Sequence, residues 1–416
     1  MNNDHTYHRL KQRYQALTQS QKTAFLKHLQ QQDISLNFDH DDINTASDHS
    51  SGYTPADRQI DISLCYFSAG LIDYYSEQYQ FILETARYAD ESGFHAIWLP
   101  ERHFADFGGL HPNPAVLAAA LAVQTHRIGI RSGSVVLPLH NPLRVAEEWA
   151  LVDQLSKGRA GVGFASGWHS NDFVLAPEEY PHRKHELFSR METVLSLWRG
   201  QAQMLPNGEQ QITETLTYPR PYHDEPIPVW LTTNTGDMFE QAGRLGVHVL
   251  TSLITCDLEV CAENIRRYRA ALEQYHPGKK GKVTLLMHTF LFSEHTTEAE
   301  NHVIAEKIRH TLSDYLKTFL GMSEQYIENN LSDTLDNIWD SNAQADEIYQ
   351  YFLTNKTLIG TQSTCQKMLD RLKQADVDEV ACLVDFGLNN ELIKQGLESL
   401  SLLQQKNQRQ QPVPKG

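Results

Sequence analysis

The chain has 416 residues, 40% of them hydrophobic, so it can bury the core of one large domain or of a few smaller ones. Its formal net charge of −16 and the lack of a basic patch argue against nucleic-acid binding. No apolar run approaches the roughly 18 residues of a membrane span, and the first residues lack the apolar core of an export signal.

The cysteines are scattered and odd in number. There are five, with no CxxC spacing, which predicts a reduced, cytoplasmic protein without a disulfide framework or a zinc knuckle. Histidines are numerous, at 20, but no H-E-x-x-H occurs, and His182 and His185 have basic residues between them. We therefore expect no metal site.

The first 59 residues differ in character from the rest. Residues 1–36 are predicted to be a helical appendage, because Phe25, Leu26 and Leu29 share one face of a helix. Residues 37–59 are polar and rich in Asp, Ser and Gly, which is typical of a linker. The appendage is not expected to belong to the main core.

From residue 60 onward, short apolar strands alternate with amphipathic helices. Eight strand candidates span residues 60–68, 94–100, 127–138, 160–167, 226–234, 247–253, 282–292 and 379–387. Repeated strand–helix units predict parallel strands, and eight of them predict an α/β protein with a (β/α)8 TIM barrel. The barrel should span residues 60–400 with a helical insertion at about 297–355, followed by a polar tail at 401–416. A doubly wound open sheet is the alternative.

Three ionisable residues follow the second strand directly, in the stretch "WLPERHF". Glu101, Arg102 and His103 come just after a buried apolar run. In a barrel, active-site residues lie at the carboxyl ends of the strands, so these side chains would reach the mouth. The alternative is that they only solvate a loop.

Small residues occur in two neighbouring strands. Gly133 and Ser134 lie within the third strand, and "GVGFASG" ends the fourth with Ser166 and Gly167. Small residues let a flat ligand approach the backbone closely, although a bulge or tight packing would also explain them. The glycine spacing departs from the dinucleotide fingerprint, and a loop follows instead of a helix, which disfavours a Rossmann site.

Polar residues connect the fifth strand to the next helix. Thr232, Thr233, Asn234, Thr235 and Gly236 offer hydroxyls and backbone N–H groups at a helix N-terminus, where phosphate binding is favoured. Ordinary capping by Thr235 or by Asp237 is the alternative, and the Asp237 carboxylate would compete with a phosphate unless it points away.

Taken together, these segments resemble the luciferase-like flavin monooxygenases. The resemblance covers about residues 60–270 in order and rests on residues 93–104, 113–168 and 228–252, and the final strand region fits as well. Residues 163–180 and 378–387 are similar to the subfamily found within polyketide and nonribosomal peptide assembly lines.

The resemblance implies a barrel that binds reduced FMN across its mouth. It places the FMN phosphate near Ser166 and Gly167 and near the segment from Thr233 through Met238. It implies further cofactor contacts at Gly133, Ser134, Ser68 and Ala69, and a non-proline cis peptide at Gly133–Ser134. The residues implied to bind the cofactor are thus Ser68, Ala69, Gly133, Ser134, Ser166, Gly167, Thr233, Asn234, Thr235, Gly236, Asp237 and Met238.

One position departs from bacterial luciferase, which carries two histidines in this stretch. Arg102 stands where the first and catalytic histidine would be, and His103 matches the second. Light emission is therefore not expected. Arg102 would stabilise an anion, and His103 would shuttle a proton.

The implied activity is an FMNH2-dependent monooxygenation, by hydroxylation or Baeyer–Villiger insertion, of a small natural-product intermediate that is free or held by a carrier protein. A separate flavin reductase and a homodimer are expected partners. The alternatives are a deazaflavin (F420)-dependent oxidoreductase and a non-catalytic interaction barrel in an assembly line.

Overall fold

The structure, a computed structural model, describes residues 59–68, 75–327 and 342–409. The predicted helical appendage at 1–36 and nearly all of the predicted linker lie outside the described residues, as does Ala69. None of the helices in these three ranges is both long and apolar enough to cross a membrane.

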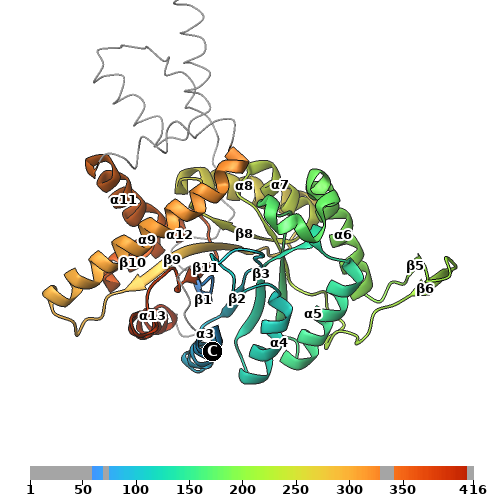
Figure 1. Cartoon of the computed structure of the whole chain (residues 1–416), viewed down its shortest axis with the longest axis horizontal. Coiled ribbons are helices and arrows are strands. Elements are labelled where there is room, and N and C mark those ends of the chain that lie inside the picture. Colours follow the sequence, from blue (N-terminus) through green and yellow to red (C-terminus); the bar gives the residue numbers. More distant parts are fainter. Residues whose placement is uncertain (1–58, 69–74, 328–341, 410–416) are drawn as a thin grey trace, which may run out of the picture.

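Eight parallel strands close into a barrel (Figure 1). Around the barrel the order is β1, β2, β3, β4, β7, β8, β9 and β11, and β11 returns to β1. Because β8 also pairs with β9, the sheet has no open break at this point, which excludes the doubly wound alternative and confirms the TIM barrel. The strands are β1 (Asp61–Cys65), β2 (Ala96–Leu99), β3 (Gly129–Val136), β4 (Ala160–Ala165), β7 (Val229–Thr232), β8 (His248–Ser252), β9 (Val283–Leu291) and β11 (Glu379–Leu383).

Helices cover the outside of the barrel. They are α3 (Tyr75–Ser92), α4 (Pro114–Gln124), α5 (Pro142–Ser156), α6 (Arg183–Trp198), α7 (Gly236–Leu245), α8 (Leu258–Tyr275), α12 (Gln362–Gln374) and α13 (Asn390–Arg409). Short 3-10 turns are η2 (Leu137–Leu139), η3 (Ser170–Leu175) and η4 (Pro177–His182). In α5 the Asn141 side chain accepts a hydrogen bond from the Leu143 N–H, and Trp149 is buried against the barrel.

Several elements were not expected from the sequence. A two-stranded hairpin, β5 (Gln203–Pro206) and β6 (Ile212–Thr215), projects from the barrel (Figure 1), and the short β10 (Leu358–Gly360) extends the sheet at β9. Helix α13 continues to Arg409, so residues 401–409 are helical and do not begin a polar tail at 401. Leu403 and Gln404 are buried, which explains why this polar-looking segment stays folded against the domain.

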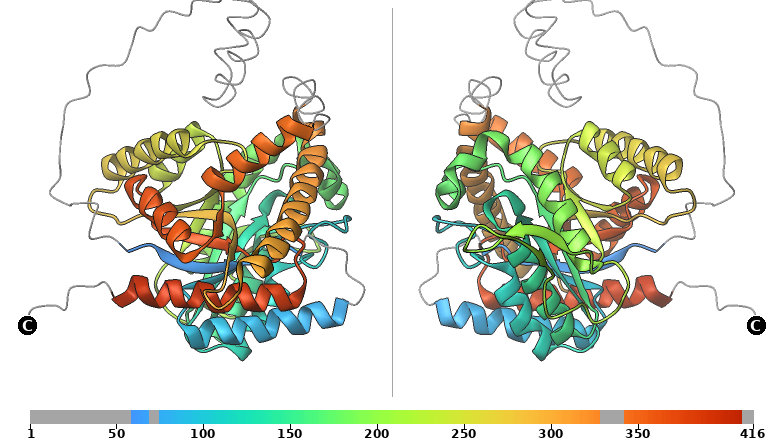
Figure 2. Two further views of the ribbon diagram at one scale, coloured as in Figure 1. Left: turned by 90° about the vertical axis from the view of Figure 1, so that its left-hand side faces the viewer. Right: turned by 90° about the vertical axis from the view of Figure 1, so that its right-hand side faces the viewer.

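The predicted insertion contains two helices in its described part. They are α9 (Glu298–Ile327) and α11 (Asn342–Lys356). Figure 2 shows these helices on one side of the molecule, while α3 and α13 lie side by side beneath the barrel. The insertion therefore sits between β9 and β10 and adds a layer that the basic barrel does not need.

A buried carboxylate holds the amino-terminal end of the barrel together. Glu379, the first residue of β11, has no exposed surface. It accepts hydrogen bonds from Ser63 at 2.5 Å, from Trp98 at 2.9 Å and from Arg131 at 2.7 and 2.9 Å. Thr284 of β9 adds a fifth bond at 3.2 Å. A side chain that reaches four other strands can lie only inside the barrel.

Two tryptophans enclose the partner of this carboxylate. The Arg131 guanidinium lies 5.1 Å from the ring centre of Trp98 and 4.5 Å from that of Trp230, and the rings meet edge to face. Burial alone would raise the pKa of Glu379, but Arg131 foremost outweighs it and lowers the pKa from 4.5 to about 2. Glu379 therefore stays charged at neutral pH, and its ion pair with Arg131 fills the barrel floor.

Replacing Glu379 with Gln should lower the free energy of unfolding by about 3–5 kcal/mol at neutral pH, because the Arg131 charge would stay buried without a counter-ion. Because the pKa of Glu379 is lowered, its charge stabilises the fold fully at pH values above 4.5, the ordinary pKa of a glutamate. This stabilisation is lost as the pH falls from 4.5 towards about 2. In urea unfolding, the difference between wild type and Glu379→Gln should be constant from about pH 7 to 5 and shrink below about pH 4. The exposed pair Glu263–Arg266 provides the control: Glu263→Gln should change the free energy by less than about 1 kcal/mol at each pH. A constant difference down to about pH 3 would contradict this account.

Candidate active site

The predicted site residues lie at the carboxyl ends of neighbouring strands. Ser68 follows β1, Arg102 and His103 follow β2, and Ser166 and Gly167 follow β4. The segment 233–238 follows β7, which pairs with β4. Since all barrel strands are parallel, these segments share one rim, as the sequence predicted.

Strand β3 shows both an irregular register and tight packing at its small residues. The Gly133–Ser134 peptide is cis, as expected, and the register between β3 and β4 shifts between Ser132 and Val135. A β-carbon at Gly133 would lie 3.1 Å from the Trp98 ring, so the packing there is tight and favours glycine. The Ser134 hydroxyl is hydrogen-bonded to the Thr232 hydroxyl and so links β3 to β7.

Ser68 is held by a buried carboxylate from the last strand region. Asp385 accepts hydrogen bonds from the Ser68 N–H at 2.8 Å and hydroxyl at 3.2 Å, and from the Phe67 N–H at 2.6 Å. Burial raises the pKa of Asp385 to about 6 although these bonds oppose the shift. Ser68 has a positive φ of 60°, so Asp385 fixes an unusual turn where the chain leaves β1.

Glu101 joins two histidines at the rim. Its Oε1 lies 2.8 Å from Nε2 of His103 and 2.5 Å from Nε2 of His140, and its Oε2 accepts the Val136 N–H at 2.7 Å. Burial would raise the pKa of Glu101, but the hydrogen bonds from the two histidines outweigh it, so the pKa is lowered. For His140, burial alone would lower the pKa, but the hydrogen bond and the charge of Glu101 outweigh it, so the pKa of His140 is raised. The carboxylate therefore stays charged and orients His103.

Arg102 is buried in an ion pair and does not face solvent. Its guanidinium donates to Asp172 of η3 at 2.8 Å and lies 5.2 Å from the ring centre of Trp168. Burial dominates both partners, since it lowers the pKa of Arg102 and raises that of Asp172. Asp172 also accepts the His103 N–H at 3.3 Å, so this pair fixes the segment that carries His103. An anion at Arg102 would have to share the guanidinium with Asp172.

The N-terminus of α7 has the features expected of an anion site. Thr235 is the N-cap residue, but its side chain makes no capping hydrogen bond. The Asp237 side chain is fully exposed, 3.9 Å from Arg267 of α8, so capping by Asp237 is not observed either. Gly236 lies so close to Arg267 that a β-carbon there would meet the guanidinium at 2.8 Å. A helix end and a cation therefore adjoin the same glycine.

The Asn234 side chain connects neighbouring strands at this rim. Its side chain accepts from the Thr251 hydroxyl at 2.8 Å and from the Ser252 N–H at 3.2 Å, and it donates to Thr255 at 3.1 Å. Thr233 accepts the Thr235 N–H at 3.2 Å. Asn234 thus ties the end of β7 to the end of β8. The Thr235 N–H and the Met238 N–H are used within the chain, and the N–H groups of Gly236 and Asp237 remain for a ligand.

Gly167 has little room for a side chain. Its φ is +77°, and a β-carbon would lie 2.7 Å from both Phe173 and Val136. Its carbonyl accepts a hydrogen bond from Arg183 at 3.3 Å. The Ser166 hydroxyl forms no hydrogen bond with any of the residues that the structure describes, so it can serve a ligand.

Aromatic residues of the insertion cover part of the mouth. The Tyr315 ring of α9 lies 4.3 Å from His288, 5.7 Å from Phe67 and 5.0 Å from Phe107, measured between ring centres. Burial lowers the pKa of His288 to about 3, so its imidazole is neutral at pH 7. Phe319 of the same helix lies 5.5 Å from Trp168. The insertion thus supplies an apolar cover that limits water at the rim.

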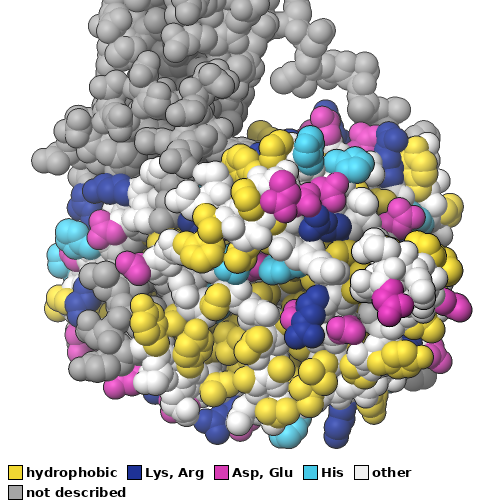
Figure 3. Space-filling model, turned by 45° about the vertical axis from the view of Figure 1, so that its right-hand side comes forward, with side chains coloured by type: hydrophobic (Ala, Val, Ile, Leu, Met, Phe, Trp, Pro, Cys, Tyr) yellow, Lys and Arg dark blue, Asp and Glu magenta, His cyan; other side chains and the backbone are white. Residues whose placement is uncertain are grey.

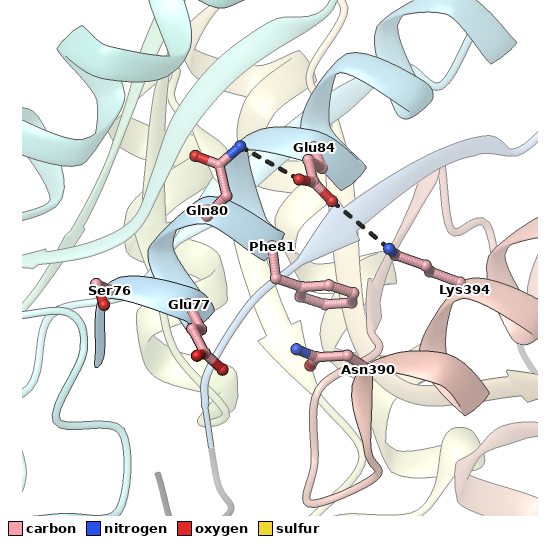
Figure 4. Close-up of a pocket in the computed structure, with 7 residues that line it drawn as sticks. All are labelled: Ser76, Glu77, Gln80, Phe81, Glu84, Asn390 and Lys394. Atoms are coloured by element: carbon pink, nitrogen blue, oxygen red, sulfur yellow. Dashed lines mark hydrogen bonds and ion pairs between the residues drawn. The ribbon is translucent and has the colours of Figure 1, made fainter. Parts of the chain in front are cut away.

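A surface depression of about 280 Å³ lies elsewhere (Figure 4). It lies between α3 and α13 on the outside of the barrel, where Glu84 is 3.5 Å from Lys394 and accepts a hydrogen bond from Gln80 at 3.2 Å. Its lining consists of Ser76, Glu77, Gln80, Phe81, Glu84, Asn390 and Lys394. None of these residues belongs to the predicted site.

Comparisons with known proteins agree with the geometry. Residues 59–379 match the luciferase-like monooxygenase family, and the chain belongs to that family. It is 26% identical over 328 residues to the oxygenase component of the flavin-dependent trigonelline monooxygenase of Acinetobacter baylyi, covering 77% of this chain and 88% of that protein. The alkanal monooxygenase alpha chain of Photorhabdus luminescens is 28% identical, over 48% of this chain and 55% of its own length.

A solved structure shares the fold. The oxygenating constituent of 3,6-diketocamphane monooxygenase of Pseudomonas putida, in complex with FMN, superposes with a TM-score of 0.66 at 16% identity, covering 86% of this chain and all of that one. The predicted enzyme class, a flavin-dependent monooxygenase, is confirmed. Proteins dependent on F420 also match, including a glucose-6-phosphate dehydrogenase of Amycolatopsis mediterranei at 28% identity over 40% of this chain and 51% of its own length.

Some residues of the site were not found from the sequence. His140, Asp172, Asp385 and Arg267 lie far along the chain from the residues that they contact. The only signal for His140 was its place just after a strand and just before a helix. The other three could be found only through the tertiary structure.

Removing the carboxylate of Asp172 should strongly destabilise the chain. Asp172→Ala removes the carboxylate that pairs with the buried Arg102 guanidinium at 2.8 Å, which costs about 3–5 kcal/mol of unfolding free energy. The double variant Arg102→Met with Asp172→Leu should recover most of this loss, because no buried charge remains. Urea unfolding of the single and double variants gives the coupling energy.

The exposed pair Arg244–Glu240 provides the control, since Glu240→Ala should cost less than about 1 kcal/mol. If the loss of unfolding free energy in the double variant equalled the sum of the losses in the two single variants, the coupling energy between Arg102 and Asp172 would be zero, and this account would be wrong.

Proposed function

We propose that the chain binds reduced FMN at this rim and oxygenates a small natural-product intermediate, by hydroxylation or Baeyer–Villiger insertion. The observation that carries the proposal is the convergence of Ser166, Gly167 and the uncapped start of α7 at the ends of the paired strands β4 and β7. These groups suit a phosphate, because they offer a hydroxyl, backbone N–H groups and the positive end of a helix dipole.

The remaining parts of the flavin would lie across the mouth. The cis peptide and the small residues Gly133 and Ser134 would face the ring system, and Ser68 and Ala69 would border it. Bound reduced FMN supplies the electrons and activates O2, which is chemistry that protein side chains lack. The chain positions the flavin and keeps water away with the aromatic cover from α9.

His103 is the proposed proton-transfer residue. Its ring is oriented by Glu101, and its backbone N–H is fixed by Asp172. A histidine changes charge near neutral pH and so can both donate and accept a proton during a reaction. Arg102 would act mainly by positioning this segment and would stabilise an anion only in competition with Asp172.

The substrate and the protein partners are also proposals. The resemblance of residues 163–180 and 378–387 to enzymes of assembly lines supports a substrate that is either free or held by a carrier protein. A separate flavin reductase is supported by the relative from Acinetobacter baylyi, which is named as an oxygenase component.

A deazaflavin-dependent oxidoreductase is the second candidate, because F420-dependent proteins share the fold and part of the sequence. The two cofactors separate the candidates, since reduced deazaflavin does not activate O2. Anaerobic titration with each reduced cofactor, followed by admission of air, should give tight binding and O2 consumption with FMN. If the chain bound reduced F420 but not reduced FMN, the FMN proposal would be overturned.

Placing a negative charge at Ser166 should weaken FMN binding. Ser166→Asp would set a carboxylate against the phosphate and lower the affinity by at least about tenfold, equivalent to about 1.4 kcal/mol. Ser166→Ala is the matched control, because it removes the hydroxyl without adding a charge, and it should weaken FMN binding less than Ser166→Asp does. Equal FMN affinity for Ser166→Asp and wild type, by anaerobic fluorescence titration, would place the phosphate elsewhere.

A homodimer is proposed through α4 and α5. Helix α4 has no charged residue, and Val116 and Val123 are 69% and 60% exposed. Helix α5, which contacts α4, has Leu151 exposed at 49%. Figure 3 shows hydrophobic side chains gathered on the lower part of the molecule, the part in which α4 and α5 lie in Figure 1. Such a surface is typical of a contact between protein chains.

Light scattering after gel filtration should therefore give twice the chain mass of 47.5 kDa. The change Val123→Glu should shift the mass to that of a monomer, because it buries an unpaired charge in the contact. Val303→Glu, at an exposed position on α9, is the control and should remain dimeric. A monomeric wild type would contradict the dimer.

A further inference from the structure

Three potential metal ligands converge at the rim from two separate segments. Glu101 and His103 follow β2, whereas His140 follows η2. One ligand atom from each lies within 4.8 Å of the other two. Both imidazole Nε2 atoms point at the same oxygen, Oε1 of Glu101, at 2.8 and 2.5 Å.

We propose that Glu101, His103 and His140 form a binding site for a divalent transition-metal ion such as Zn²⁺. Zinc bonds to imidazole nitrogen and carboxylate oxygen are about 2.0–2.2 Å long, so tetrahedral ligand atoms lie roughly 3.3 Å apart. The three ligand atoms lie within 4.8 Å of one another, so shifts on the order of 1 Å would bring them to this spacing. The ion would then replace the two hydrogen bonds at Oε1.

The second oxygen of Glu101 is already fixed in the way that metal sites require. Its Oε2 accepts the Val136 N–H at 2.7 Å, which holds the carboxylate plane and leaves Oε1 to face the histidines. Outer hydrogen bonds of this kind orient metal ligands and raise their affinity. The Glu101 side chain has no exposed surface, so an ion there would also neutralise a buried charge.

The site has an entry path. The His140 side chain is 29% exposed and that of His103 is 9% exposed, so an ion can arrive from the side of His140. Arg190 lies near His140 and opposes a cation, but its guanidinium is paired with Glu179 at 2.5 Å and with Glu186 at 3.2 Å. The nearby Glu148 favours the ion.

The ligand set selects the kind of metal. Two imidazoles and one carboxylate suit Zn²⁺, Co²⁺ or Fe²⁺, whereas Mg²⁺ and Ca²⁺ prefer oxygen ligands only. Three protein ligands leave a fourth position for water, as in sites where the metal exchanges or reacts. The sequence showed no metal motif, because His140 joins the other two ligands only through the turn at η2.

Metal binding at this site can be tested separately from the proposed oxygenation, because it can be measured without flavin. The two are connected through His103. An ion that binds His103 removes its imidazole from proton transfer, so an enzyme loaded with Zn²⁺ should lose any activity that requires a free His103.

Calorimetric titration of the metal-free full chain with Zn²⁺ tests the proposal. Wild type should bind one Zn²⁺ that His140→Ala, His103→Ala and Glu101→Gln each weaken by at least about tenfold. His185, whose side chain is 82% exposed and lies 3.1 Å from Glu186, provides the control, so His185→Ala should bind as wild type does. Excess Mg²⁺ should not compete.

Two further measurements keep the test decisive for a chain with 20 histidines. Co²⁺ should give visible absorption bands of a four- or five-coordinate nitrogen and oxygen site in wild type, and His140→Asn should abolish them. Circular dichroism confirms that each variant is folded. Equal Zn²⁺ affinity for wild type, His140→Ala and His140→Asn would assign the binding to surface histidines and overturn the proposal.

Discussion

The ion pair between Glu379 and Arg131 is the constraint on which the arrangement of the barrel depends. Glu379 receives hydrogen bonds from residues of β1, β2, β3 and β9, so it fixes the stagger of these strands at their amino-terminal ends. In a closed parallel barrel, that stagger decides which residues reach the opposite rim. Replacing the pair by hydrophobic residues could preserve stability, but it would lose this directional fixing of the strands.

The two ends of the barrel use buried charge differently. At the floor, Arg131 and Glu379 are matched and enclosed by Trp98 and Trp230, which leaves no group for a ligand. At the rim, Glu101 has one oxygen bound to the backbone and one shared by two histidines. A carboxylate whose partners are imidazoles can exchange protons or accept a metal, whereas one paired with arginine cannot. The buried carboxylate with two imidazole partners thus lies at the rim, and the arginine-paired Glu379 lies at the floor.

The sequence predicted the eight barrel strands because buried parallel strands are short apolar runs bounded by glycine, proline and polar residues. It missed β10, which has three residues, and the exposed hairpin of β5 and β6, which lacks an apolar pattern. The polar tail was wrong for residues 401–409, because composition alone hides the buried positions of an amphipathic helix such as Leu403. The start of α7, which follows β7 directly, was within reach of the sequence, whereas the cis Gly133–Ser134 peptide within β3 was expected only from the family resemblance. The contacts of Glu101 with His140 and of Arg102 with Asp172 were not, because each requires a loop to fold back across the rim.

Arg102 shows how one substitution can change the role of a position without changing the fold. Where bacterial luciferase has a histidine, this chain has an arginine that lies against Trp168 and pairs with Asp172. A guanidinium stays charged at every pH at which the protein is folded, so it cannot act as a base. The proposed acid–base function therefore rests on His103, the other ionisable side chain that follows Arg102 in this stretch, whose ring contacts Glu101. The same contact makes His103 a potential metal ligand. Arg102, through Asp172, thus fixes the backbone of His103, whose side chain is proposed both to transfer protons and to bind a metal ion.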